Sequence, residues 1–250
     1  MLVPSSVAAP VRPEAAFPPE LRAHLQVRDR LKRGMDLGLT LVLLVVAAPV
    51  VVVGWVLVRL TSSGPGFYSQ TRVGRFGEPF EILKLRTMYH RCEAKTGAAW
   101  ATRNDPRVTP VGRILRKLHI DELPQLLNIL RGDMSLVGPR PERPEFVGPL
   151  SQAIPGYADR LRVRPGLTGL AQIQLPPDTD LDSVRRKIVL DRAYLDRRGL
   201  GLDLRLLAGT AVYLCGLSYG GVRRTLRLPN PLADLADALA DTVVESSVPN

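Results

Sequence analysis

The strongest constraint on the fold is an uncharged, largely apolar run of about 22 residues from Leu37 to Val58. As an α-helix rising about 1.5 Å per residue, this run would extend about 33 Å, enough to cross the hydrocarbon core of a bilayer. It is too long and begins too late for a cleaved signal peptide, and no small-residue cleavage site follows it closely. The run therefore predicts a membrane segment.

Pro49 lies near the middle of this run and predicts a kink or a reversal there. A proline inside a helix removes one backbone donor and clashes with the preceding turn. A single span usually has basic residues on one side only, whereas this run has them on both sides, at Arg28, Arg30, Lys32 and Arg33 and again at Arg59, Arg72 and Arg75. The residues alone are compatible with a kinked span and with a segment that returns to the face it entered.

Length and charge narrow the function classes. A chain of 250 residues has room for one domain with appendages. The net charge of +10 points to a polyanionic partner such as nucleic acid, an anionic bilayer or phosphorylated substrates. Aromatic residues make up only 5%, which argues against nucleic acid, because single-strand binding needs stacking platforms. The spacing of Cys92, Cys215 and the three histidines favours neither a zinc site nor a histidine triad.

The composition divides the chain into four parts. Residues 1–19 are rich in Pro, Ala and Ser and read as a disordered lead. Residues 20–60 contain a short basic amphipathic helix, suited to lipid headgroups or to a soluble surface, and the apolar run. Residues 61–229 form the predicted main folded domain, and residues 230–250 a helical tail. The expected fold class is α+β, a mostly helical small domain with a short β-hairpin.

The hairpin carries two candidate phosphate ligands. Residues 67–70 and 80–87 are strand-like, and glycines between them supply a turn. Period-two alternation places Lys84 and Arg86 on one face, about 6 to 7 Å apart, which suits a diphosphate. A basic strand end in water is the alternative.

Asp121 and Glu122 stand side by side in an otherwise basic stretch. Apolar residues at helical spacing precede and follow them, and Pro124 would interrupt a continuous helix, so the pair is expected at a helix start or kink. Such a pair is commonly a helix cap, but free amides there also suit phosphate chemistry. Neighbouring helical side chains point about 100° apart, so one acid would attack while the other binds a metal.

Two further arginines lie in segments stiffened by proline. Arg140 stands between Pro139 and Pro141, and Arg164 precedes Pro165. Such rigid backbone suits an oriented phosphate contact, although proline-bounded surface loops are also common.

Ordered strings of residues carry a resemblance to a known family. They are Lys32-Arg33-x-x-Asp36, Pro49, Gly64-Pro65 with Gln70-x-Arg72-x-Gly74, Phe80-x-x-x-Lys84-Leu85-Arg86-Thr87-Met88, Asp121-Glu122-Leu123-Pro124-Gln125-Leu126-x-Asn128, Gly132-Asp133-Met134-Ser135-x-Val137-Gly138-Pro139-Arg140-Pro141, and Arg164-Pro165-Gly166-x-Thr168-Gly169 with Gln172. Together they make the chain resemble the bacterial sugar transferase family, the monotopic phosphoglycosyl transferases that start glycan assembly on a polyprenol phosphate.

The resemblance implies a reaction and a site. A UDP-sugar would give its phospho-sugar to polyprenol (undecaprenyl) phosphate, releasing UMP through a covalent aspartyl intermediate, as the first membrane step of exopolysaccharide, O-antigen, capsule or glycoprotein glycan assembly. By matching positions, Asp121 would be the nucleophile and Glu122 would help hold Mg²⁺, with Asp121 as a second metal contact. The implied substrate ligands are Lys84, Arg86, Arg113, Arg140, Arg164, Thr168 and Gln172.

The resemblance also implies a location. The membrane segment would be re-entrant, broken at Pro49, with interfacial amphipathic helices and a catalytic domain facing the cytoplasm at the inner membrane. Only about 31 residues precede the matching core, as in a minimal catalytic unit.

Three positions depart from the family pattern: Ala48 where Ser is frequent, His119 where a small hydroxyl residue is common, and Leu170 where Trp is frequent. The last two leave the sugar open, and the residues leave a homodimer open. A non-catalytic membrane adaptor on anionic lipid is the competing hypothesis, in which the acidic pair would be only a cap.

Overall fold

The computed structural model describes residues 17–20, 29–92 and 105–233. Residues 1–16 of the predicted disordered lead, most of the basic amphipathic helix before residue 30 and most of the C-terminal tail lie outside these ranges. Within the described end of the lead, Phe17 is buried and its ring lies 5.6 Å from that of Phe76. The chain forms two compact units, residues 1–167 and 168–250. The boundary between them falls inside the predicted main folded domain.

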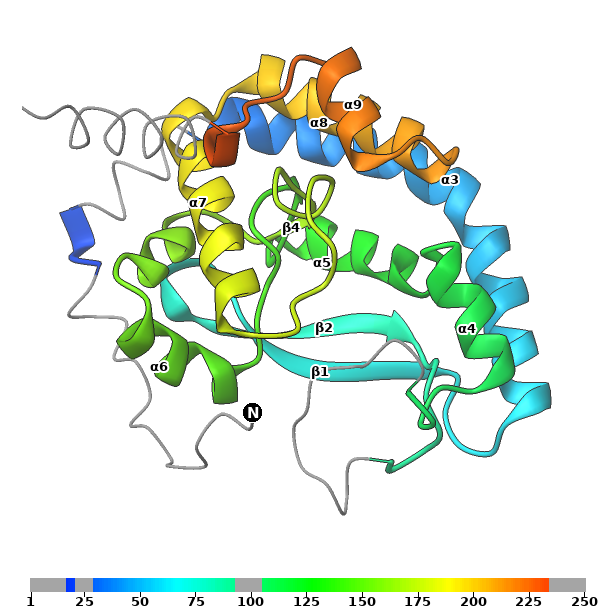
Figure 1. Cartoon of the computed structure of the whole chain (residues 1–250). Coiled ribbons are helices and arrows are strands. Elements are labelled where there is room, and N and C mark those ends of the chain that lie inside the picture. The colour runs from blue at the N-terminus through cyan, green and yellow to red at the C-terminus, as the bar shows by residue number, and fades with distance from the viewer. Residues whose placement is uncertain (1–16, 21–28, 93–104, 234–250) are drawn as a thin grey trace, which may run out of the picture. The chain divides into compact units, whose positions relative to one another are not determined.

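Unit 1 mixes helices with a small sheet, as Figure 1 shows, and the described part of unit 2 contains three helices after a stretch of turns and coil. The α+β class predicted from the sequence is confirmed. The elements of unit 1 are α3 (Arg30–Thr61), β1 (Phe67–Val73), η1 (Arg75–Gly77), β2 (Pro79–Leu85), α4 (Pro110–Lys117), η2 (Ile120–Gln125), α5 (Leu126–Arg131), β3 (Ser135–Val137), α6 (Pro144–Ala153) and η3 (Tyr157–Arg162), with β4 (Gly166–Thr168) at its end. Unit 2 contains α7 (Leu181–Arg197), α8 (Leu200–Leu214) and α9 (Tyr219–Thr225).

The predicted hairpin is confirmed. β1 and β2 are antiparallel, with Tyr68 opposite Lys84 and the turn residues in η1. The free edge of β2 is paired by a side chain, because the buried Asn128 amide accepts from the Leu83 amide (3.0 Å) and donates to the Glu81 carbonyl (2.7 Å). Asn128 thus replaces a third strand and fixes β2 against η2 and α5.

α3 is one helix of 32 residues with Pro49 inside it. Its ribbon changes direction partway along (Figure 1). Proline cannot donate to the carbonyl one turn earlier, and this loss commonly bends a helix. Pro49 therefore does not interrupt the helix: the predicted break is at most a bend within one element.

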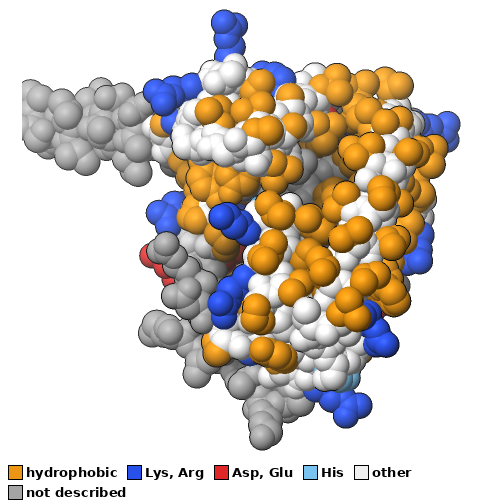
Figure 2. Space-filling view, turned by 90° about the vertical axis from the view of Figure 1, so that its right-hand side faces the viewer, with side chains coloured by type: hydrophobic (Ala, Val, Ile, Leu, Met, Phe, Trp, Pro, Cys, Tyr) orange, Lys and Arg blue, Asp and Glu red, His pale blue; other side chains and the backbone are white. Residues whose placement is uncertain are grey.

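The outer surface of α3 is apolar. Its buried residues form one stripe, and Figure 2 shows hydrophobic side chains crowded over the face turned to the viewer. By length and composition the helix could cross a membrane. Its exposed large apolar side chains are Leu31, Leu39, Leu41, Val42, Leu43, Val45, Val46, Val50, Val52, Val53, Trp55, Val56, Leu57 and Leu60. So much contiguous apolar surface is unfavourable in water and indicates membrane association.

The first part of α3 is held to unit 1 by charged side chains. The buried Asp36 carboxylate accepts from the Ser135 hydroxyl (2.8 Å) and the Leu136 amide (3.2 Å). Arg33 donates to two carbonyls at the end of α5, at 2.5 and 3.0 Å. The last carbonyls of a helix lack the full set of intrahelical donors, and of these two the Ile129 carbonyl also accepts from the Gly132 amide at 3.1 Å. The string Lys32-Arg33-x-x-Asp36 therefore joins the apolar helix to the rest of unit 1.

The last part of α3 packs on β2. Val58, Leu85 and Leu115 form a buried cluster. A Cβ added at Gly54 would lie 2.7 Å from a methyl carbon of Leu85, so β2 approaches the helix where there is no side chain. Glycine at this position permits the close contact.

We expect Asp36→Ala to lower the free energy of unfolding by about 1 to 3 kcal/mol, because it leaves the buried Ser135 hydroxyl and Leu136 amide without their acceptor. Thermal unfolding in detergent measures this change. Lys32→Ala is the matched control: it removes a partly exposed ion pair of 3.7 Å with the same carboxylate and should cost less than about 1 kcal/mol. Equal losses in the two variants would contradict the structural role of Asp36.

Candidate active site

The acidic pair lies where the sequence predicts it, at the start of a helix. α4 ends at Lys117, and His119 takes a left-handed conformation (φ 55°) before the 3-10 helix η2 begins at Ile120. Asp121 and Glu122 occupy the first turn of η2. Pro124 lies inside η2, and α5 starts directly after η2 ends. The helical patterns predicted before and after the acidic pair are therefore separate elements, α4 and α5.

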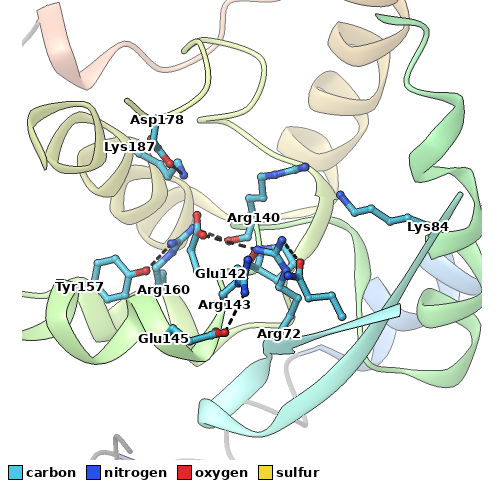
Figure 3. Close-up of polar contacts among 12 residues, drawn as sticks. Arg72, Lys84, Arg140, Glu142, Arg143, Glu145, Tyr157, Arg160, Asp178 and Lys187 are labelled. Atoms are coloured by element: carbon cyan, nitrogen blue, oxygen red, sulfur yellow. Dashed lines mark hydrogen bonds and ion pairs between the residues drawn. The ribbon is translucent and has the colours of Figure 1, made fainter. Parts of the chain in front are cut away.

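Glu122 is bound by two cations from different elements. Lys84 of β2 approaches its Oε1 at 2.7 Å, and Arg140 donates to both carboxylate oxygens, at 3.2 Å to Oε2. Figure 3 shows the Lys84 and Arg140 side chains extending toward each other. Burial alone would raise the pKa of Glu122, but Arg140 and Lys84 outweigh it and hold that pKa well below its usual range. Glu122 is therefore a fixed negative charge.

Asp121 has a different environment. It is 7% exposed, and no described residue donates a hydrogen bond to its carboxylate. Burial and the neighbouring Glu122 raise its pKa, and Lys84, Arg116 and Arg140 only partly oppose them. The two adjacent acids thus differ. The Glu122 carboxylate is ionised and paired with two cations, whereas the Asp121 carboxylate is buried and accepts no hydrogen bond from a described residue. The predicted division of labour, attack by Asp121 and metal binding by Glu122, stays a prediction.

Lys84 and Arg86 do not form the predicted clasp. The Lys84 ammonium binds Glu122, and burial lowers its pKa. The buried Arg86 guanidinium instead donates to the carbonyls of Ser62 and Ser63, just past the C-terminal end of α3. The alternation of β2 ends at Leu85, so period-two reasoning did not apply to Arg86. As a substrate ligand Arg86 stays a prediction, and the structure gives it a helix-capping role.

The other predicted ligands are distributed unevenly. Arg164 donates to the Gly132 carbonyl at 2.8 Å, after the end of α5. Arg113 is exposed on α4. Thr168 and Gln172 belong to unit 2, where the Thr168 hydroxyl bonds that of Thr210 at 2.7 Å. The structure brings together Asp121, Glu122, Lys84 and Arg140 from the predicted set.

Arg116 is a site residue that the sequence prediction did not select. It is a cation that lowers the pKa of Asp121, and its Nε donates to the Thr87 hydroxyl at 2.7 Å. Arg113 and Arg116 lie on the same short helix, so composition could not separate them. The sequence signal available was proximity, because Arg116 is closer than Arg113 to the acidic pair along the chain.

The donors present can be compared with the needs of Mg²⁺. This ion is commonly bound by one or two carboxylates, with water and substrate phosphates completing six ligands. The described residues contain no group of three or more acidic, histidine or cysteine side chains that could enclose a metal by itself. Asp121 fits such a ligand because its oxygens accept no hydrogen bond from the part of the chain that the structure describes, whereas those of Glu122 are bound to Lys84 and Arg140. The donor set fits a metal shared with substrate.

The opposite pKa shifts of the two acids predict opposite effects on stability. A raised folded pKa means that the ionised Asp121 is unfavourable in the native state, so Asp121→Asn should raise the unfolding temperature at pH 7. The gain should disappear as pH falls through the folded pKa of Asp121. Glu122→Gln should lower the free energy of unfolding by about 2 kcal/mol at pH 7, because two cations lose their partner. That loss should shrink as pH falls below about 4.5 toward the folded pKa of Glu122.

Thermal unfolding of the two variants in detergent between pH 4 and 8 measures these differences. Asp182→Asn is the control, since its side chain is 79% exposed and a surface ion pair contributes less than about 1 kcal/mol. A lower unfolding temperature of Asp121→Asn at pH 7 would mean that the ionised carboxylate stabilises the fold, against the raised pKa.

Comparison with known proteins identifies the family. Residues 27–216 match the bacterial sugar transferase family. The chain is 44% identical over 211 residues, 84% of its length, to a UDP-glucose:undecaprenyl-phosphate glucose-1-phosphate transferase of Caulobacter vibrioides, and covers 76% of that protein. It is 38% identical over 218 residues, 82% of its length, to the exopolysaccharide production protein ExoY of Rhizobium meliloti, covering 93% of it.

A third relative acts on another sugar. It is the UDP-N-acetylgalactosamine-undecaprenyl-phosphate N-acetylgalactosaminephosphotransferase of Aeromonas hydrophila, 42% identical over 180 residues, which are 72% of the chain and 42% of that protein. The family match spans most of the chain, and it includes the acidic pair, Lys84 and Arg140. The chain therefore belongs to the bacterial sugar transferase family and is a phosphoglycosyl transferase.

Proposed function

We propose that the chain transfers a sugar-1-phosphate from a UDP-sugar to a polyprenol phosphate through a covalent intermediate on Asp121. The observation that carries this proposal is the contrast within the acidic pair: Asp121 is buried with free oxygens, while Glu122 is neutralised by Lys84 and Arg140. A helix cap would not need two cations on its second acid. The relatives named for undecaprenyl-phosphate support the lipid acceptor.

In the first proposed step, an Asp121 carboxylate oxygen attacks the phosphorus that carries the sugar. The bond from this phosphorus to the oxygen bridging the two phosphates breaks, and UMP leaves with that oxygen and the bonding electron pair. Asp121 then carries the phospho-sugar as an acyl phosphate. Burial favours attack, since a desolvated carboxylate with a raised pKa is more basic and has no hydrogen bond to give up.

In the second step, an oxygen of polyprenol phosphate attacks the same phosphorus. The bond between phosphorus and Asp121 breaks, and the carboxylate is restored together with polyprenol diphosphate sugar. Phosphoryl transfer depends on positioning and on stabilising charge at the transferred oxygens. Arg140, Arg116 and Lys84 surround Asp121 and are the cations we assign to this role.

Glu122 keeps these cations in place before substrate arrives. In this assignment it holds Lys84 and Arg140, which would otherwise repel each other. Bound Mg²⁺ would neutralise the diphosphate and stabilise the departing phosphate. Asp121 and the substrate phosphates would be its ligands, with Glu122 joining them if a substrate phosphate takes over one of its cations.

We also propose that α3 is a re-entrant anchor and that the catalytic unit faces the cytoplasm at the inner membrane. The support is the bend in a helix that contains Pro49, together with basic residues on both sides of the apolar run. This placement would hold Asp121 near the headgroups, where a soluble UDP-sugar meets the phosphate of a buried lipid.

Asp121→Asn should abolish UMP release with polyprenol phosphate and UDP-sugars, a loss of at least about 10³-fold, because the amide cannot form the phospho-sugar adduct. A coupled UMP assay in nanodiscs, run across UDP-sugars, measures this and identifies the sugar. Glu122→Gln should reduce kcat by about 10² or more, with an altered Mg²⁺ dependence.

Glu145→Gln is the matched control for both variants. It removes an acid that is 54% exposed and pairs with Arg143, and UMP release should stay within twofold of the parent. Full UMP release by Asp121→Asn would exclude the covalent mechanism. A membrane adaptor predicts a different result: the parent releases no UMP from any UDP-sugar, and Asp121→Asn and Glu122→Gln behave like the parent.

The topology has its own test. The test starts from a variant with Cys92 and Cys215 replaced by Ser and introduces single cysteines at Gly34, in the first turns of α3, and at Ser62, just beyond its end. Both cysteines should react with a membrane-impermeant maleimide in inverted vesicles, which expose the cytoplasmic face. Neither should react in right-side-out vesicles. A re-entrant helix leaves both ends on one face, whereas a span separates them by about 30 Å of hydrocarbon. Labelling of the two positions from opposite sides would show a span.

A further inference from the structure

The loop that carries Arg140 has an unusual hydrogen-bonding pattern. Each of its four successive carbonyls accepts a hydrogen bond from another part of unit 1. The donors are the Gly166 amide to Pro139 (2.9 Å), Arg160 Nη2 to Arg140 (2.7 Å), Arg72 Nη1 to Pro141 (3.2 Å) and the Val73 amide to Glu142 (2.9 Å). Two of the four donors are arginine side chains rather than backbone amides.

The sequence of the loop explains why side chains are needed. Pro139 and Pro141 have no amide hydrogen, so the loop cannot join a regular strand ladder on both sides. Buried carbonyls still need donors. A guanidinium can supply one at the right distance, and Figure 3 shows Arg72 and Arg160 lying beside the Arg140 loop.

Arg160 is the more deeply buried of the two. It lies in η3, is 4% exposed, and its guanidinium is 5.4 Å from the ring centroid of Tyr157, whose hydroxyl accepts from Nη1 at 3.3 Å. Burying a cation is unfavourable unless its donors are used. An apolar side chain such as leucine would fill this space without burying a charge.

We propose that Arg160 is a positioning residue for the reaction: by holding the Arg140 carbonyl, it sets the point from which the Arg140 side chain reaches Glu122 and a substrate phosphate. Arg160 acts through Arg140, since its guanidinium donates to that backbone and not to the acidic pair. Displacing a catalytic group by about 1 Å can reduce a rate by about 10². Where activity is the readout, this inference rests on the proposed transferase function.

The first test needs no activity. Phenylglyoxal modifies accessible guanidinium groups, and the Arg140 side chain is 38% exposed but bound to Glu122. In the full chain in detergent, Arg160→Met should make Arg140 react several-fold faster, as followed by mass spectrometry of its peptide. Arg162→Met, in the same short helix with a side chain that is 50% exposed, should leave the rate unchanged. An unchanged rate in Arg160→Met would overturn the proposal, whatever the activity assay shows.

The second test uses UMP release. Arg160→Met should lower kcat by about 10- to 100-fold with KM within about threefold, and Arg160→Lys should recover part of this loss. In an Arg140→Lys background, Arg160→Met should lower kcat by less than about threefold further, because the group it positions is already altered. A full, additive loss in that background would show that Arg160 acts by another route and would overturn the proposal.

Tyr157→Phe keeps the test decisive if Arg160→Met fails to fold. It removes the hydroxyl that accepts from Arg160 and retains the ring. Faster modification of Arg140 and a smaller loss of kcat are expected, and parental values for both would contradict the proposal. If the parent protein releases no UMP from any UDP-sugar, the proposed function fails, while the phenylglyoxal result still decides this inference.

Discussion

The contact on which the site depends is the neutralisation of Glu122 by Lys84 and Arg140. It joins three segments that are distant in sequence: the end of β2, the first turn of η2 and the proline-bounded loop after β3. Each cation alone would be unfavourable so close to the other, and the carboxylate would be unfavourable if buried without them. Together they form a preorganised cluster of charges beside Asp121, whose own carboxylate accepts no hydrogen bond from the described residues.

Strand β2 also links this cluster of charges to the apolar helix α3. Three consecutive residues at the end of β2 and just after it contact different groups. Lys84 binds Glu122, Leu85 packs against Val58 of α3, and Arg86 caps the end of α3. The position of Lys84 is therefore fixed beside two residues that contact the helix. The close approach at Gly54 and the Asp36 contacts make α3 part of the packing of unit 1.

Much of this organisation could be predicted from the sequence, because it depends on local periodicity. The hairpin, the helix over residues 110–117 and the placement of Asp121 and Glu122 at a helix start are examples. Arg86 does not share a strand face with Lys84, because the strand ends at Leu85. Arg116 was not selected over Arg113, since the choice depends on how α4 packs. The roles of Asp36, Asn128 and Arg160 are long-range hydrogen bonds, which no local pattern encodes.

The sequence by itself determined the apolar helix, the α+β class and the family, because length of apolar run, periodicity and ordered motifs are properties of neighbouring residues. Only the tertiary structure decided which charges meet. Lys84 and Glu122 are 38 residues apart, and Arg140 is 18 residues beyond Glu122. The fold also decided that Asp121 has a raised and Glu122 a lowered pKa, because burial and cation contacts differ between two adjacent carboxylates that composition cannot distinguish.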